Sequence, residues 1–259
     1  MLHILFSNFR DKWMLSIKVF FMVVVPGLFV QYFIRTKGWD ILDMNIIIAS
    51  LLTGAVFLIG FMLAGILQDF KESEQILGAV SNSILSFQDH NRTEPNVKKR
   101  KEFMGYLIDF TKTIKNWLEE KKMVESVLDK LNELNGYAAK FDNQSCTSWI
   151  EENQKTLRQS ITRIDVIKKT TFIKAGYTIM EIISAAVIVL ILFSKTDTFI
   201  LGAATYAASS FTLVYMILLI KDMDDPFQFG QNDHGVAEAS MLPITDALGW
   251  LEREYKKMR

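Results

Sequence analysis

Residues 45–67 read NIIIASLLTGAVFLIGFMLAGIL and contain no charged side chain. A helix needs ~20 mostly apolar residues to cross the ~30 Å hydrocarbon core of a bilayer, and this stretch is long enough. Residues 17–33, 172–193 and 198–220 have the same character and are nearly free of charge. The four stretches pair into two apolar hairpins. This layout predicts an all-α membrane protein with four transmembrane helices and a long helical cytoplasmic insert between spans two and three.

The predicted division of the chain follows these hairpins. Residues 1–67 hold an N-terminal lead helix and spans one and two, and residues 68–171 form a cytoplasmic helical stalk. Residues 172–220 form the second hairpin, and residues 221–259 form a cytoplasmic C-terminal segment with an acidic cluster. We expect the lead helix to lie at the headgroup level, with a frayed terminus as the alternative, because apolar rings stand beside basic side chains there. These residues are Phe6, Phe9, Arg10, Lys12, Trp13 and Lys18.

Charge in this chain is segregated. The 259 residues are 50% hydrophobic and 22% charged with a net charge of zero, but the charges concentrate between residues 68 and 171. No basic tail is present, which argues against nucleic acid as a partner. The single cysteine, Cys146, excludes an intrachain disulfide and fits a reducing compartment. Because the common metal-ligand, nucleophile and phosphate-loop motifs are missing, we do not expect an enzyme.

Basic residues in the short loops predict the orientation in the membrane. The loop between spans one and two carries two basic residues, and the loop between spans three and four carries one. The N-terminal lead and the ends of the stalk carry more, so the positive-inside rule places both termini and the stalk in the cytoplasm. A plasma or inner membrane location is expected. Tyr32 and Trp39 fit an aromatic belt at the outer ends of spans one and two.

Apolar residues recur through the insert at spacings of three and four, which is typical of amphipathic helices. Pro95 suits a first helical turn, Asn135 and Gly136 suit a helix end, and residues 148–151 form a capping box. No run alternates long enough to predict a strand. We expect these helices to continue spans two and three and to pack on each other or on neighbouring subunits. Their apolar stripe comprises Val97, Phe103, Tyr106, Leu107, Phe110, Ile114, Trp117, Leu118, Val124, Val127, Leu128, Leu131 and Leu134.

Span two carries two features that compete for its interpretation. Ala49, Thr53, Gly60 and Ala64 lie close to one helical face, where small side chains permit tight helix packing. Phe57 and Phe61 are four residues apart and would form an apolar ring in an oligomeric pore, a constriction that gates by dewetting. From the span alone, packing is the simpler interpretation.

Glu181 is a carboxylate about two turns inside span three. Such a group costs a few kcal/mol unless it is paired or hydrated, so it is a functional candidate by default. The structural alternative is that it reaches the interface or pairs with Lys174.

An acidic cluster follows span four. Asp222, Asp224, Asp225 and Asp233 stand beside Asn232 at a cytoplasmic membrane edge. One interpretation is a hard-cation site completed by backbone carbonyls, although the spacing matches no EF-hand loop. The other is pairing with Lys or Arg of the stalk. A membrane-embedded enzyme would need these carboxylates to share a cavity with Glu181.

The layout resembles the bestrophin and bestrophin-like membrane proteins. Residues 221–233, KDMDDPFQFGQND, are similar to the Asp-Pro-Phe-Gly stretch and following acidic and Asn residues of that family. A later Leu-Pro element matches residues 242 and 243. Residues 67–78, LQDFKESEQILG, stand where bestrophins carry a Phe-Arg segment. Glu72, Ser73 and Glu74 replace the family's Tyr-Asp-Arg-Trp pattern there.

The resemblance implies a homopentamer in which span two lines an axial pore and Phe57 and Phe61 form its neck. Thr53 and Ala64 are further pore candidates on the same helix. It also implies that Asp222, Asp224 and Asp225 fall where bestrophins bind Ca²⁺, although bacterial members often lack calcium dependence.

These features favour an oligomeric channel for small inorganic ions, mainly anions, in a lipid bilayer. The alternative is a non-conducting membrane scaffold or sensor whose cytoplasmic helices bind a partner. That alternative predicts an apolar surface of partner size on residues 97–134.

Overall fold

The computed structural model describes residues 13–43, 46–119, 122–140, 144–170, 174–227, 229 and 238–258. The chain forms two compact units. Unit 1 holds the described residues of Met1–Asp69 and Thr171–Asp224, and unit 2 holds those of Phe70–Thr170, Asp225–His234 and Glu238–Arg259. Helix α3, Ile46–Asn91, contributes to both. Most of the predicted lead helix, residues 1–12, lies outside the described residues.

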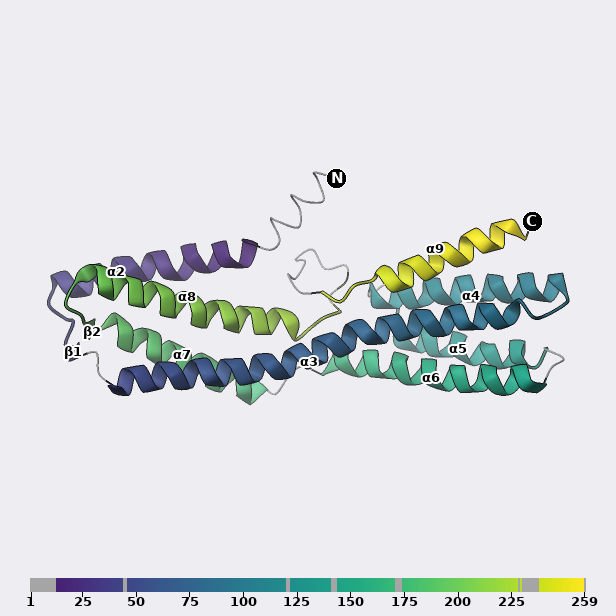
Figure 1. The fold of residues 1–259 in the computed structure, drawn as a ribbon, viewed down its shortest axis with the longest axis horizontal. Helices are drawn as coiled ribbons and strands as arrows, with labels where there is room; N and C mark the ends of the chain where they lie inside the picture. Colours follow the sequence, from purple (N-terminus) through teal and green to yellow (C-terminus); the bar gives the residue numbers. More distant parts are fainter. Residues whose placement is uncertain are drawn as a thin grey trace. The chain divides into compact units, whose positions relative to one another are not determined.

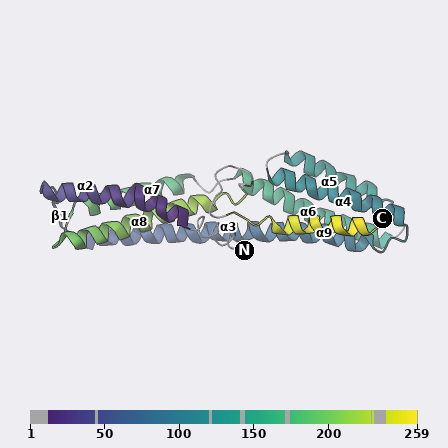
Figure 2. The same cartoon turned by 90° about the horizontal axis from the view of Figure 1, so that it is seen from above.

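Unit 1 is built from apolar helices (Figure 1). Within the described residues, four helices are long and apolar enough to cross a membrane: Trp13–Thr36, Ile46–Asn91, Lys174–Leu192 and Phe199–Met223. The last two are α7 and α8, which lie side by side (Figure 2). The first contains a π-helical turn, Phe20–Val24, followed by α2, Val25–Thr36. Pro26 explains this turn. Proline has no backbone N–H, so it cannot donate the hydrogen bond that a carbonyl of the preceding helical turn would otherwise accept.

The loops at one end of unit 1 are tied together. Strand β1, Leu42–Asp43, pairs in parallel with β2, Ser194–Lys195. Arg35 donates hydrogen bonds to the hydroxyl and carbonyl oxygens of Thr196 at 3.2 and 3.1 Å. The sequence did not predict these strands, since two residues are too few to show an alternating pattern.

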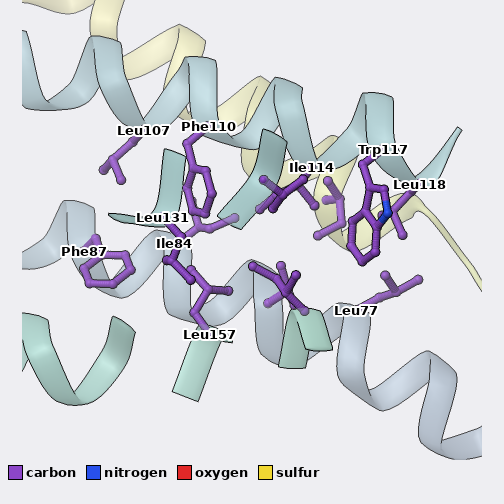
Figure 3. Packing of buried hydrophobic residues seen from close by; sticks show 14 of the residues in the cluster. Leu77, Ile84, Phe87, Leu107, Phe110, Ile114, Trp117, Leu118, Leu131 and Leu157 are labelled. Carbon is purple, nitrogen blue, oxygen red and sulfur yellow. The ribbon is translucent and has the colours of Figure 1, made fainter. Parts of the chain in front are cut away.

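Unit 2 is a helical bundle around one apolar core. It combines the second half of α3 with α4 (Val97–Leu118), α5 (Val124–Ala138), α6 (Gln144–Lys169) and α9 (Leu242–Lys257). Figure 3 shows Phe110, Leu131 and Leu157 meeting α3 side chains such as Ile84 and Phe87. The predicted apolar stripe of the insert, apart from the exposed Val97, therefore contributes to the core of this bundle.

Three predicted helix boundaries were wrong. Helix α4 begins after Pro95, because the Asn96 side chain caps it by accepting hydrogen bonds from the backbone N–H groups of Lys98 and Lys99. Asn135 and Gly136 lie inside the last turn of α5, and α6 begins at Gln144 rather than at residue 148. The insert continues span two as one helix, but α6 ends at Lys169 and Thr170 is not helical.

Candidate functional site

Helix α3 has one covered and one uncovered face in unit 1. Ala55, Ile59, Met62 and Ile66 recur at spacings of three and four and are all buried. The opposite face carries the pore candidates Thr53, Phe57, Phe61 and Ala64, and all four are exposed in the protomer. Phe57 and Phe61 are 76% and 73% exposed. Burial thus fixes the rotation of α3, which a span that is apolar on every side leaves undetermined.

The small residues of span two do not pack against any other helix that the structure describes. Ala49, Thr53, Gly60 and Ala64 are all exposed, and a Cβ atom built on Gly60 would meet nothing within 4 Å. Close helix packing along this face therefore requires a partner outside the protomer.

The uncovered face continues along α3 with polar side chains. At helical spacing after Ala64 and Leu67 come Lys71, Gln75 and Asn82, which are exposed. We define Thr53, Phe57, Gly60, Phe61, Ala64, Leu67, Lys71, Gln75 and Asn82 as the α3 stripe. The sequence analysis missed its polar half, although extending the helical period from Phe57 past residue 67 would have found it.

Glu181 pairs with a lysine that sequence reasoning did not identify. The Lys221 ammonium of α8 donates to its carboxylate at 2.5 Å, and both side chains are about half exposed. Lys174, the predicted partner, is not the one that the structure brings to Glu181. Equal counting from the loop between α7 and α8 would have paired Glu181 with Ser210, so the sequence alone could not locate Lys221.

The acidic residues after span four do not gather into a metal-ligand group in the part of the chain that the structure describes. The carboxylate of Asp224 interacts electrostatically with the hydroxyl of Tyr177 in α7. Asp233 and Asn232 lie outside the described residues, so a calcium site with Asp222, Asp224, Asp225 and Asp233 stays a prediction. Glu181 and Asp224 contact different side chains, which gives no support to a shared catalytic cavity.

Charged pairs hold the helices of unit 2 together at its surface. Arg163 of α6 donates from Nε and Nη2 to the two carboxylate oxygens of Glu72 in α3, both at 2.8 Å. Glu72 departs from the bestrophin pattern, and its place in this bidentate pair gives it a structural role. The Lys140 ammonium, 2.7 Å from Glu102, lowers the pKa of that carboxyl.

The described residues of 97–134 do not offer the apolar surface that a scaffold would need. Among the described residues of 97–134, the large apolar side chains on the exposed side are Val97 and Met123. Those at most 2% exposed lie in the core of unit 2: Phe103, Met104, Leu107, Phe110, Ile114, Leu118, Val127, Leu131 and Leu134.

Comparison with known proteins identifies the fold. No family model and no curated protein matches the chain. A variant of a bacterial bestrophin homolog from Klebsiella pneumoniae superposes with a TM-score of 0.71 at 13% identity, covering 96% of this chain and 98% of its own. A second variant of that protein gives a TM-score of 0.74 at 15% identity, with 93% and 96% covered. A structure described as a membrane protein gives 0.73 at 15% identity, with 92% and 98% covered.

At these identities the likeness shows the fold. The chain therefore has the fold of bacterial bestrophin homologs, and its apolar helices make it an integral membrane protein. The predicted all-helical architecture and the resemblance seen in the sequence are confirmed at this level.

Proposed function

We propose that the protein is an oligomeric ion channel whose axial pore is lined by the α3 stripe. The observation that carries this proposal is the exposure of Phe57 and Phe61 on one face of a helix whose other face is buried. Among the described residues, no helix of the protomer covers the side chains on this face, and rotational symmetry brings such faces together around an axis. The bestrophin fold supports the same arrangement, because the sequence resemblance implies a pentamer with span two at the axis.

The four apolar helices cross the bilayer, with unit 2 and both termini in the cytoplasm. Support comes from their length and from the basic residues of the lead and the insert. The membrane is the plasma or inner membrane. Permeation involves no covalent chemistry: ions pass an apolar neck at Phe57 and Phe61, and that neck gates by losing its water.

The channel selects small anions. Lys71 is the first charged side chain of the stripe beyond the apolar neck. It follows Phe61 by ten residues, or ~15 Å along the helix axis, so its ammonium group lies in the passage that leads to the neck. Each subunit of an oligomer adds one ammonium group at this level. The next charge at this spacing, Asp89, lies ~27 Å further along the helix, so Lys71 is the charge of the stripe that is nearest to the neck.

Recording of single-channel currents from purified protein in planar bilayers tests the proposal. Phe57→Ala with Phe61→Ala should raise conductance or open probability because the neck becomes wider and more easily wetted. Phe29→Ala is the matched control, since Phe29 is an equally exposed phenylalanine of α2. In a salt gradient, Lys71→Glu should shift the reversal potential toward that of cations.

Two outcomes would refute parts of the proposal. An inserted oligomer that passes no current removes the channel assignment. Unchanged currents in the double phenylalanine variant remove Phe57 and Phe61 from the neck. The scaffold alternative lacks support from residues 97–134, whose apolar side chains are largely buried.

A further inference from the structure

A cavity of about 700 Å³ opens at the tied loops of unit 1. Pockets that hold small molecules fall in the range ~300–1,000 Å³. Its wall combines two cationic side chains, Arg35 and Lys195, with the carboxylates of Asp40, Asp43 and Asp197. The pairing of β1 with β2 brings these residues together from two loops far apart in the sequence. The channel proposal gives this cavity no role.

The five charges do not neutralise one another. Within the described part of the chain, none of them forms an ion pair within 4 Å, although both signs line the same cavity. The three carboxylates also do not form a metal-ligand group among the described residues. The wall therefore presents separate positive and negative groups, which suits a ligand that carries both charges.

Arg35 is positioned for an anionic oxygen group. Thr196 accepts two of its hydrogen bonds, through Oγ1 and the backbone carbonyl, and Thr196 Oγ1 itself donates to the carbonyl of Thr198 at 3.0 Å. A guanidinium has five N–H donors, so three remain for a phosphate or carboxylate, which it binds in a fixed fork geometry.

Thr196 is held by close packing behind the cavity wall. A Cβ atom on Gly202 would lie 2.6 Å from Thr196 Oγ1 and 3.3 Å from Gln31 Nε2, so these two side chains meet over a glycine. Gln31 is 5% exposed, and its Oε1 has no hydrogen-bond partner within the described residues. A buried acceptor without a partner is costly unless a donor reaches it.

Aromatic side chains mark the depth of the cavity in a bilayer. Tyr32 and Phe199 form an edge-to-face pair at this end of unit 1, as do Phe33 and Trp39. Exposed Tyr and Trp concentrate at the level of the lipid headgroups.

We propose that this cavity binds a compact zwitterion, an ammonium group joined to a phosphate, as found in the phosphatidylethanolamine headgroup. Arg35 and Lys195 hold the phosphate, and the carboxylates of Asp40, Asp43 and Asp197 accept hydrogen bonds from the ammonium. A choline headgroup has no N–H to donate, and a phosphatidylglycerol headgroup has no cation. This assignment does not rest on ion conduction.

Native mass spectrometry of the purified protein, titrated with phosphatidylethanolamine, phosphatidylcholine and phosphatidylglycerol, tests the proposal. Phosphatidylethanolamine should bind about tenfold more tightly than either other lipid, the difference expected for lost charge-assisted hydrogen bonds. Arg35→Gln should weaken it by about tenfold. Lys37→Gln is the matched control, because Lys37 is a cation of the same loop that lies over the Phe33 ring outside the cavity.

Asp43→Asn keeps the proposal testable if Arg35→Gln loosens the loops. It should reduce the preference for phosphatidylethanolamine over phosphatidylglycerol, because it removes a partner of the ammonium alone. Competition by soluble O-phosphoethanolamine assigns the site to free zwitterions, and binding of the lipid without such competition assigns it to the bilayer. Equal binding of all three lipids, or wild-type binding by both Arg35→Gln and Asp43→Asn, overturns the proposal.

Discussion

Replacing Gly27 with alanine should drive α2 and α8 apart. A Cβ atom at this position would lie 1.7 Å from the Tyr206 hydroxyl oxygen, half of the 3.4 Å at which ordinary contact begins. It would also lie 2.3 Å from Cζ and 2.6 Å from Cε1 of the same ring. Tyr206 is only 3% exposed, so its ring has no open space to enter. The helices must therefore separate, or the buried ring must leave its position.

The expected cost is that of overpacking a core, about 1–3 kcal/mol. For a chain of this size, that corresponds to a fall of about 3–10 °C in the midpoint of thermal unfolding. The assay is thermal unfolding of the detergent-solubilised protein, followed by intrinsic fluorescence and size-exclusion chromatography.

A double-mutant cycle identifies the cause. Tyr206→Phe should not rescue Gly27→Ala, because Cζ and Cε1 remain too close. In a Tyr206→Ala background, Gly27→Ala should cost little, since alanine favours a helix over glycine by about 1 kcal/mol. Gly54→Ala is the control, because a Cβ atom there meets nothing within 4 Å. If the Gly27→Ala variant unfolded at the same temperature as the parent protein, the close approach of α2 and α8 would be refuted.

Three further predictions concern stability, each read from thermal unfolding. Phe110→Ala, in the core of unit 2, should cost about 3–5 kcal/mol, and a loss below 1 kcal/mol would contradict the packing of that core. Burial raises the pKa of the Tyr106 hydroxyl above its ordinary value of 10.0, so the folded chain keeps this proton while the unfolded chain releases it. The associated stability is complete below pH ~10 and is lost as the pH rises further. Tyr106→Phe should flatten this alkaline decline in stability. It should also cost about 1 kcal/mol at neutral pH, because it removes the 2.7 Å hydrogen bond that the Tyr106 hydroxyl donates to the Lys130 carbonyl. An unchanged pH dependence of stability in this variant would contradict the role of the Tyr106 proton. Glu181→Gln should cost about 1 kcal/mol because it leaves the Lys221 ammonium without its carboxylate partner. Adding Lys221→Gln to the same chain should restore the lost stability, and additive losses from the two changes would show that the groups do not interact.

Strong periodicity made the insert predictable. Leu107, Phe110 and Ile114 recur at helical spacing among polar neighbours, and all three are fully buried. The start of α4 depended on which of two neighbouring residues, Pro95 or Asn96, occupies the first helical turn. Pro95 and Asn96 are both compatible with a first turn, but the Asn96 side chain satisfies two backbone N–H groups and therefore fixes the cap.

The candidate site was less predictable because it depends on rotation and on pairing across helices. A span that is apolar on all sides has no periodic signal, so the exposed face of Phe57 became identifiable only from the burial of Ala55 and Ile59. The partner of Glu181 lies forty residues away, on a helix whose register sequence periodicity does not determine. The cavity beside Arg35 requires two loops to meet through strands of two residues each, which leave no pattern in the sequence.

Exposure alone does not separate a pore-lining residue from a lipid-facing one, because Phe29 of α2 is as exposed as Phe57. Composition along the helix separates them. On the helix face of Phe29, Met22 lies seven residues before it and Phe33 four residues after it, and both are apolar, exposed and suited to lipid. Along the α3 stripe, Phe57 is followed by small residues and then by Lys71, Gln75 and Asn82. In the proposed channel, this order of side chains corresponds to a narrow apolar neck that opens into a hydrated passage in unit 2.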